Sequence, residues 1–198
     1  MTPGLLLSAA IFSFVLAVTP GPNNTVMLLS AANFGLKKTL PYLFGILAGL
    51  AVMLVAIGAG LGLIFATFPV IYQTLKWIGF GYILWLAYQL IRSSSKSTTG
   101  ESKQVGFWRS TIFQFANPKA WIAAASFMTA FVPLDTGLAT ATFTGSIFLI
   151  ASFPGAFIWV AAGQMLGTWL SSPARRRSFN ISSAVLLVLS MIPVMFLH

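Results

Sequence analysis

The sequence has no cysteine and almost no acidic charge. Among its 198 residues only Glu101 and Asp135 are acidic, and the single histidine is the last residue, His198. Without cysteine the chain can form neither a disulfide nor a thiolate metal site, and it has no thiol nucleophile. Without clustered histidines or carboxylates it also lacks the usual metal ligands and the groups of an acid–base catalyst. We therefore expect no cofactor, no metal and no enzymatic activity.

Charge of either sign is scarce. Charged residues make up 7% of the chain and hydrophobic residues 58%, whereas soluble proteins carry about 25% charged residues. This composition excludes a soluble enzyme and a disordered binding protein. The net charge of +9 would suggest a nucleic-acid partner in a soluble chain. Here the basic residues sit in short links between apolar segments, so membrane topology explains them and we expect no nucleic-acid partner.

Long uncharged segments are abundant. Several reach the roughly 20 apolar residues that cross a bilayer core. We predict an all-α membrane protein that forms a single transmembrane domain over residues 1–198, with the lipid bilayer as its surroundings. The predicted spans are residues 5–34, 41–65, 69–91, 108–132, 138–169 and 179–197.

The basic residues predict the orientation. Nine of the eleven lie near the links after the first, third and fifth spans: Lys37, Lys38, Arg92, Lys96, Lys103, Arg109, Arg175, Arg176 and Arg177. Alternate links share one side of the membrane, and the positive-inside rule makes that side the cytoplasm. Both termini should then be periplasmic. Lys76, near the outer end of the third span, is expected to snorkel to the interface.

The spans divide into two halves of three. Residues 1–92 form the predicted first repeat, 93–107 a hydrophilic cytoplasmic linker, and 108–198 the second repeat. Because each half has an odd number of spans, a duplicated second half lies upside down relative to the first. Inverted repeats of this kind recur in secondary transporters, where broken helices build a substrate site near the membrane midplane.

Each half contains a matching interruption. The first span is broken at Thr19-Pro20-Gly21-Pro22-Asn23-Asn24, and the fourth at Asn117-Pro118-Lys119. Half helices result, because neither Leu5–Val18 nor Ala120–Val132 is long enough to cross a bilayer alone. We predict that helices 1 and 4 break at these Pro-Asn motifs in the central part of the membrane. The alternative is a pair of ordinary proline kinks, with Lys119 snorkelling to an interface.

The predicted breaks favour an anionic group. An asparagine followed by proline reads as an N-cap and first helical position, so both half helices direct positive N-terminal ends at the membrane centre. Lys119 adds a full charge there, while no acidic residue lies in any span. These features suit a zwitterionic amino acid, its carboxylate at Lys119 and the helix ends and its amine at carbonyls freed by the breaks. The candidate substrate-binding residues are Pro20, Gly21, Pro22, Asn23, Asn24, Tyr82, Gln114, Asn117, Pro118 and Lys119.

Small residues recur at helical spacing. Gly45-x-x-x-Gly49 and Gly163-x-x-x-Gly167 allow helices to approach closely. We predict that both motifs pack within the chain. A homodimer contact is the alternative.

Several motifs together resemble those of the LysE/RhtB family of amino-acid exporters. They are Thr19-Pro20-Gly21-Pro22-Asn23, Gly79-x-x-Tyr82-x-x-x-Leu86 and Gln114-Phe115-x-Asn117-Pro118-Lys119-Ala120. The resemblance covers essentially the whole chain. The opening Met-Thr-Pro, the second asparagine Asn24 and Phe107-Trp108 resemble in particular its cysteine and O-acetylserine exporter branch.

This resemblance implies a six-span exporter in the bacterial inner membrane. Its substrates would be small amino acids or derivatives, either cysteine/O-acetylserine-like or homoserine/threonine-like, and its export would be coupled to the proton gradient. An acidic residue that family members carry soon after the fourth span is shifted here to Asp135. No role is therefore carried over to Asp135.

Lys119 is the central candidate for proton coupling. Our hypothesis is that it alternates between holding the substrate carboxylate and binding a proton, although uniport down a substrate gradient is equally compatible with the sequence. The main alternative function is a passive pore or channel for small solutes. A structural subunit of a larger complex is the other.

Overall fold

The computed structural model describes residues 2–61, 67–93, 106–133, 137–170, 172–189 and 191–192. Within these ranges the chain is helical and contains no strand, which confirms the all-α class. The α-helices are α1 (Pro3–Val18), α2 (Pro22–Phe34), α3 (Leu36–Ala56), α5 (Pro69–Ser93), α6 (Phe107–Phe115), α7 (Pro118–Phe131), α8 (Leu138–Trp169) and α9 (Pro173–Leu189), and a π-helical segment, η1 (Ile57–Leu61), extends α3. Most of the predicted linker and Asp135 lie outside the described residues.

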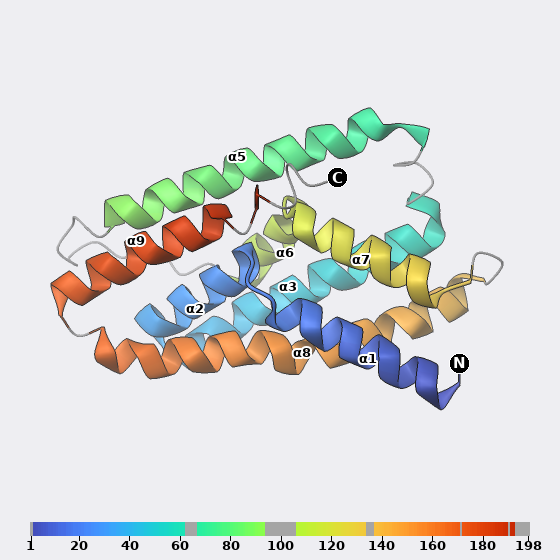
Figure 1. Cartoon of the computed structure of the whole chain (residues 1–198), viewed down its shortest axis with the longest axis horizontal. Coiled ribbons are helices and arrows are strands. Elements are labelled where there is room, and N and C mark those ends of the chain that lie inside the picture. Colours follow the sequence, from blue (N-terminus) through green and yellow to red (C-terminus); the bar gives the residue numbers. More distant parts are fainter. Residues whose placement is uncertain are drawn as a thin grey trace.

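The helices run along the long axis of an elongated bundle (Figure 1). The longest, α8, packs against α1, α2 and α3, and α3 also packs against α6. On the opposite side of the bundle α5 packs against α9 (Figure 1). The pairs α1–α2 and α6–α7 each run end to end through the middle of the molecule (Figure 1). The two helix interruptions, between α1 and α2 and between α6 and α7, therefore lie at its centre.

Among the described residues, two large apolar clusters and a small third one build the core. One contains Met27 and Tyr42 and is formed by α2, α3, α5, α6, α8 and α9. The other contains Phe127 and Phe148 and is formed by α1, α3, α7 and α8. The third cluster contains Met53, Ala120 and Trp121 and lies next to the break between α6 and α7.

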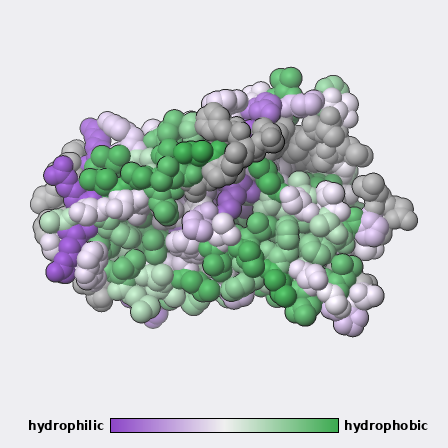
Figure 2. Space-filling view, viewed as in Figure 1, coloured by the Kyte–Doolittle hydropathy of each residue, from purple (hydrophilic) through white to green (hydrophobic). Residues whose placement is uncertain are grey.

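Among the described residues, two helical stretches are long and apolar enough to cross a membrane alone. They are Leu36–Gly60 and Leu138–Gly167, and Pro3–Val18 with Pro22–Phe34 passes the same test as a pair bent by 61°. Much of the surface in Figure 2 is hydrophobic, while hydrophilic residues gather at the end of the molecule where α2 meets α3 and α8 meets α9. The molecule therefore has the composition of a multi-pass membrane bundle with one basic end.

Both glycine motifs pack within the chain, as predicted. A side chain at Gly45 or Gly49 would collide with α6, at Ser110 and Gln114 respectively. A side chain at Gly163 or Gly167 would collide with the α2 backbone. The close contact between α3 and α6 places Gln114 against α3 at the centre of the bundle.

Two helices begin before the corresponding predicted spans. Helix α3 begins at Leu36, ahead of the predicted span 41–65, and α9 begins at Pro173, ahead of the predicted span 179–197. The basic residues of these links therefore lie on the first turns of helices. Gly35, with φ 85°, turns the chain sharply, and the Leu36 amide donates to Gln164 Oε1 at 2.6 Å, so α3 starts directly after α2.

The prediction that Lys76 snorkels was wrong. Its side chain is 2% exposed. Lys76 shares the helical stripe of α5 that also carries the buried residues Gly79, Ile83 and Ala87. Because these positions are three or four residues apart, they face the same side of the helix, and here that side is the interior.

Candidate functional site

The first interruption separates α1 from α2. Helix α1 ends at Val18, α2 begins at Pro22, and their axes meet at 61°. Thr19 and Gly21 between them are both extended, with ψ of 130° and 174°. Each precedes a proline, whose ring disfavours a helical conformation in the preceding residue. The two residues that precede prolines, Thr19 and Gly21, thus explain why the helix ends here.

The second interruption separates α6 from α7. Helix α6 ends at Phe115, and Asn117 is extended, with φ −93° and ψ 99°, before Pro118 opens α7. Proline suits this first helical position because it has no backbone N–H to leave unsatisfied. The Trp121 indole N–H donates to the Phe115 carbonyl at 2.9 Å and so satisfies the end of α6.

A lysine joins the two interruptions. Lys119 Nζ donates to the carbonyl oxygens of Thr19 and Pro20, each at 2.8 Å. Gly21 makes room for this arrangement, because a β-carbon there would lie 2.9 Å from Lys119 Nζ. The half-buried lysine therefore reaches the neighbouring break, and it does not extend along α7 toward a membrane interface.

The other carbonyls at the end of α1 also have donors. Asn24 Nδ2 donates to Ala17 O and Thr19 O, each at 2.8 Å, and the Trp159 indole N–H donates to Val18 O at 3.2 Å. These bonds compensate the negative C-terminal end of a helix that stops inside the bundle. The sequence suggested that carbonyls freed at the breaks would hold a substrate amine. In this structure the chain's own donors occupy those carbonyls at the first break.

A side-chain hydrogen bond connects α2 with α6. Asn23 Nδ2 donates to Gln114 Oε1 at 2.5 Å. Gln114 is 2% exposed and lies against Gly49 of α3. Thr111 Oγ1 donates to the Gly45 carbonyl at 3.0 Å, which further fixes α6 on α3. Residues from both interruptions are therefore held together by direct contacts.

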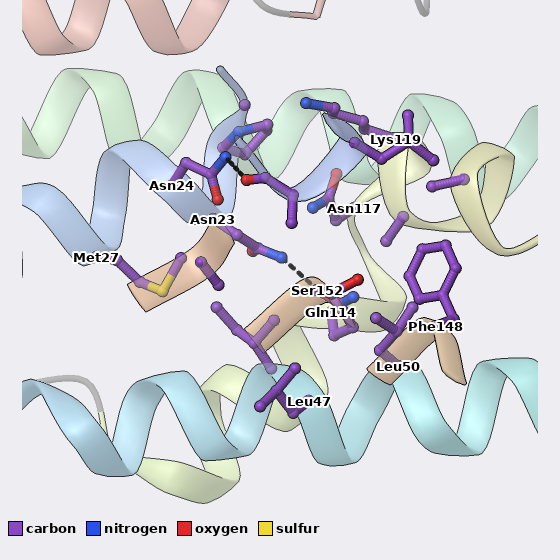
Figure 3. A pocket seen from close by; sticks show the side chains of 18 residues that line it. Asn23, Asn24, Met27, Leu47, Leu50, Gln114, Asn117, Lys119, Phe148 and Ser152 are labelled. Atoms are coloured by element: carbon purple, nitrogen blue, oxygen red, sulfur yellow. Dashed lines mark hydrogen bonds between the residues drawn. The ribbon is translucent and has the colours of Figure 1, made fainter. Parts of the chain in front are cut away.

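A cavity of about 90 Å³ lies where the interruptions meet (Figure 3). A buried water needs at least about 10–15 Å³, so the cavity has room for several water-sized groups. Its wall is mainly apolar and includes Leu50, Met27 and Phe148. Polar groups come from Asn23, Asn24, Gln114, Asn117, Lys119 and Ser152.

Two helix N-termini begin at this cavity. The N-cap residues of α2 and α7 are Gly21 and Asn117, both of which line it. Neither makes a side-chain capping hydrogen bond. The first N–H groups of a helix have no partner within it, and they carry its positive end. The cavity therefore has two N-terminal helix ends on its wall, together with the Lys119 ammonium.

Most of the residues proposed from the sequence come together here. Gly21, Pro22, Asn23, Asn24, Gln114, Asn117 and Lys119 line the cavity. Pro20 contributes the carbonyl bound by Lys119, and Pro118 opens α7, but neither lines the cavity. Tyr82 does not line it either: its ring packs on Phe113 and Trp85, with centroids 5.1 and 5.3 Å apart.

Sequence reasoning missed the contribution of α8. Ser152 and Phe148 line the cavity from this helix. Both lie in a mainly apolar span, where no charge, asparagine or helix break distinguishes them from their neighbours. The nearby Pro154 lies inside α8 without interrupting it and gave the only local signal.

Comparison with known proteins identifies a family. The family model described as "LysE type translocator" matches residues 14–197 of this chain. Cysteine/O-acetylserine efflux proteins of Salmonella choleraesuis (strain SC-B67) and Salmonella typhimurium (strain LT2) are 34% identical over 191 residues, which cover 95% of this chain and 96% of each relative. The protein of the same name from Escherichia coli (strain K12) is 32% identical over 191 residues, with the same coverage.

No solved structure matches the chain significantly. The matched family covers nearly the whole sequence, and the full-length relatives are efflux proteins and not enzymes. The chain therefore belongs to the LysE family of translocators, multi-pass transporters of the inner membrane.

Proposed function

We propose that this protein exports small amino acids or their derivatives from the bacterial cytoplasm. Compounds like cysteine and O-acetylserine are the first candidates, because relatives that match almost the whole chain carry that name. Homoserine- and threonine-like substrates are the second candidates. All share an α-amino carboxylate and a short side chain, which suits a small cavity with a mainly apolar wall.

The observation that carries this proposal is the meeting of two helix N-termini at one cavity. Gly21 and Asn117, where α2 and α7 begin, both line it. Free N–H groups and the helix dipole at such ends stabilise an anion. The substrate carboxylate would lie there, with its side chain toward Met27, Leu50 and Phe148.

The proposed membrane topology has six crossings in two inverted repeats. Residues 1–92 and 108–198 form the repeats, and each begins with an end-to-end helix pair, α1–α2 or α6–α7. The exposed basic residues Lys37, Lys38, Arg92, Arg109, Arg175 and Arg177 favour a cytoplasmic location for their end of the bundle. The N-terminus lies at the opposite end (Figure 1) and would be periplasmic, together with the C-terminus.

Lys119 is the proposed coupling residue for a proton antiport. It is the one charged side chain among the described residues that line the cavity. As an ammonium it holds the Thr19 and Pro20 carbonyls strongly, because hydrogen bonds from a charged donor are the stronger ones. Loss of its proton would weaken that link and allow α1 and α7 to separate. One proton would enter the cell as one amino acid leaves.

The test is transport by the purified protein in liposomes. Cysteine efflux that is saturable and stereoselective, and that accelerates when a proton gradient is directed into the liposomes, supports a proton-coupled carrier. In such a carrier protons enter as the substrate leaves. Saturable efflux that ignores the proton gradient supports a uniporter and removes the coupling role. Flux that rises linearly with concentration and does not distinguish enantiomers identifies a pore and rejects the proposal.

A further inference from the structure

Two buried side-chain oxygens at the cavity have no hydrogen-bond partner. They are Oδ1 of Asn23 and Oδ1 of Asn117. Both residues line the cavity, one from the start of α2 and the other from the start of α7 (Figure 3). Asn117 is 3% exposed. Buried polar atoms are almost always paired, so each of these oxygens needs an explanation.

The usual structural role of an N-cap asparagine does not explain Asn117. In that role the side-chain oxygen accepts from an N–H in the first turn of its own helix. Asn117 makes no such bond. Its backbone is extended and fixed by Pro118, and its oxygen is left unpaired. The side chain therefore has an acceptor that the fold itself does not use.

The side-chain oxygen of Asn23, Oδ1, is also unpaired. Its Nδ2 is committed to Gln114 Oε1, which leaves its Oδ1 without a donor. The partly buried Asn23 and the buried Gln114 thus share one bond, and the Asn23 side-chain oxygen is left without a partner.

The other acceptors at the first break are already used. The carbonyls of residues 17–20 accept from Asn24, Trp159 and Lys119. No acidic side chain lies among the described residues that line the cavity. A ligand group with several N–H donors could therefore pair with the two unpaired oxygens of Asn23 and Asn117.

We propose that the side-chain oxygens of Asn23 and Asn117 form the subsite for the α-ammonium group of the exported amino acid. This inference rests on the proposed export function and assigns the two ends of the substrate. The carboxylate lies at the positive N-terminal ends of α2 and α7, and the ammonium lies at the two asparagine oxygens. An ammonium group donates three hydrogens, so it can satisfy both oxygens at once.

The assignment makes a free α-amine the requirement for recognition. An acylated nitrogen has lost its charge and all but one of its hydrogens. O-acetylserine and N-acetylserine have the same atoms, and only the former retains its ammonium. The site should accept the ester and reject the amide, and it should likewise prefer cysteine to 3-mercaptopropionate, which lacks the amine.

The experiment measures competition with cysteine efflux in liposomes that contain the full chain. In the unmodified protein, 3-mercaptopropionate and N-acetylcysteine should inhibit at least about tenfold more weakly than O-acetylserine, because the two asparagine oxygens would stay unpaired. Equal inhibition by the amine-free compound would overturn the proposal without the need for any variant.

The decisive variant is Asn117→Leu, which keeps the side-chain size and removes the oxygen. It should raise the KM for cysteine about tenfold or more while leaving inhibition by 3-mercaptopropionate unchanged. A purely structural role would weaken both equally and would overturn the assignment. Asn33→Leu is the matched control, because Asn33 is exposed on α2 and does not line the cavity. Absence of saturable cysteine, homoserine or threonine efflux in the unmodified protein would reject the export function itself.

Discussion

Lys119 Nζ lies 2.8 Å from the carbonyl oxygen of Pro20, a residue 99 positions earlier in the chain. The bond connects the N-terminal end of α7 to the extended segment between α1 and α2. It joins the two halves of the sequence at the point where each is interrupted. Movement of one half against the other would have to stretch or break it.

Replacement of Lys119 by methionine should strongly slow export, because methionine cannot gain and lose the proton that would make and break this bond. The substitution keeps the apolar stem and removes the donor, so the Thr19 and Pro20 carbonyls lose the bonds that Lys119 provides. We expect the rate of cysteine efflux in liposomes to fall at least about tenfold, because the closed arrangement then lacks a charged hydrogen bond, a contact that contributes about 1.5–3 kcal/mol. Lys38→Gln, at the exposed start of α3, should transport normally. Near-normal efflux by Lys119→Met would remove the lysine from the mechanism.

Gly21→Ala should affect the same contact without touching the lysine. The added β-carbon would lie 2.9 Å from Lys119 Nζ and 3.0 Å from its Cδ, so the side chain must move away from the carbonyls. The extended backbone at this position is open to alanine, with φ −174°. We expect a folded protein with reduced export, measured by size-exclusion profile and efflux rate. Unchanged efflux would mean that the position of the lysine is not critical.

Gly79→Ala should destabilise the fold. A β-carbon there would collide with the Ala116 carbonyl and lie 3.1 Å from Pro118 Cδ, so α5 would be pushed off the second interruption. Overpacking of this kind costs about 1–3 kcal/mol. Gly81→Ala is the control on the same helix, because nothing lies within 4 Å of its added carbon. Thermal unfolding in detergent should show a lower midpoint for the first variant alone; equal midpoints would contradict the packing.

Tyr82→Phe should leave export within about twofold of the unmodified protein. The Tyr82 ring packs on Phe113 and does not line the cavity, and phenylalanine preserves that contact. The measurement is the KM and maximal rate of cysteine efflux. A large loss would place the hydroxyl on the substrate route after all.

Local chemistry made the helix ends at the two interruptions predictable. Thr19, Gly21 and Asn117 each precede a proline, and this information lies in adjacent residues. The glycine motifs were predictable for a similar reason, because a small residue every fourth position marks one helix face. The class of the protein followed from its composition. These features depend on neighbours in the sequence.

Features that depend on distant contacts were not predictable. The partner of Lys119 lies in the other half of the sequence, so no local pattern could show that the carbonyls at the end of α1 would be occupied. The burial of Lys76 was missed because its charge was taken to favour an exposed position. Its helical spacing from the buried Ile83 instead places it on the interior face of α5. Ser152 joined the cavity only through the packing of α8, which its own sequence does not indicate.

The end of α1 is also a junction between separate parts of the bundle. Its last carbonyls receive hydrogen bonds from Asn24 on α2, Trp159 on α8 and Lys119 on α7. A partial opening would leave some of these oxygens bare in a poorly solvated environment, which is costly. A movement of α1 away from α2, α7 or α8 therefore needs new donors for these oxygens, which makes the end of α1 an anchored point of the bundle.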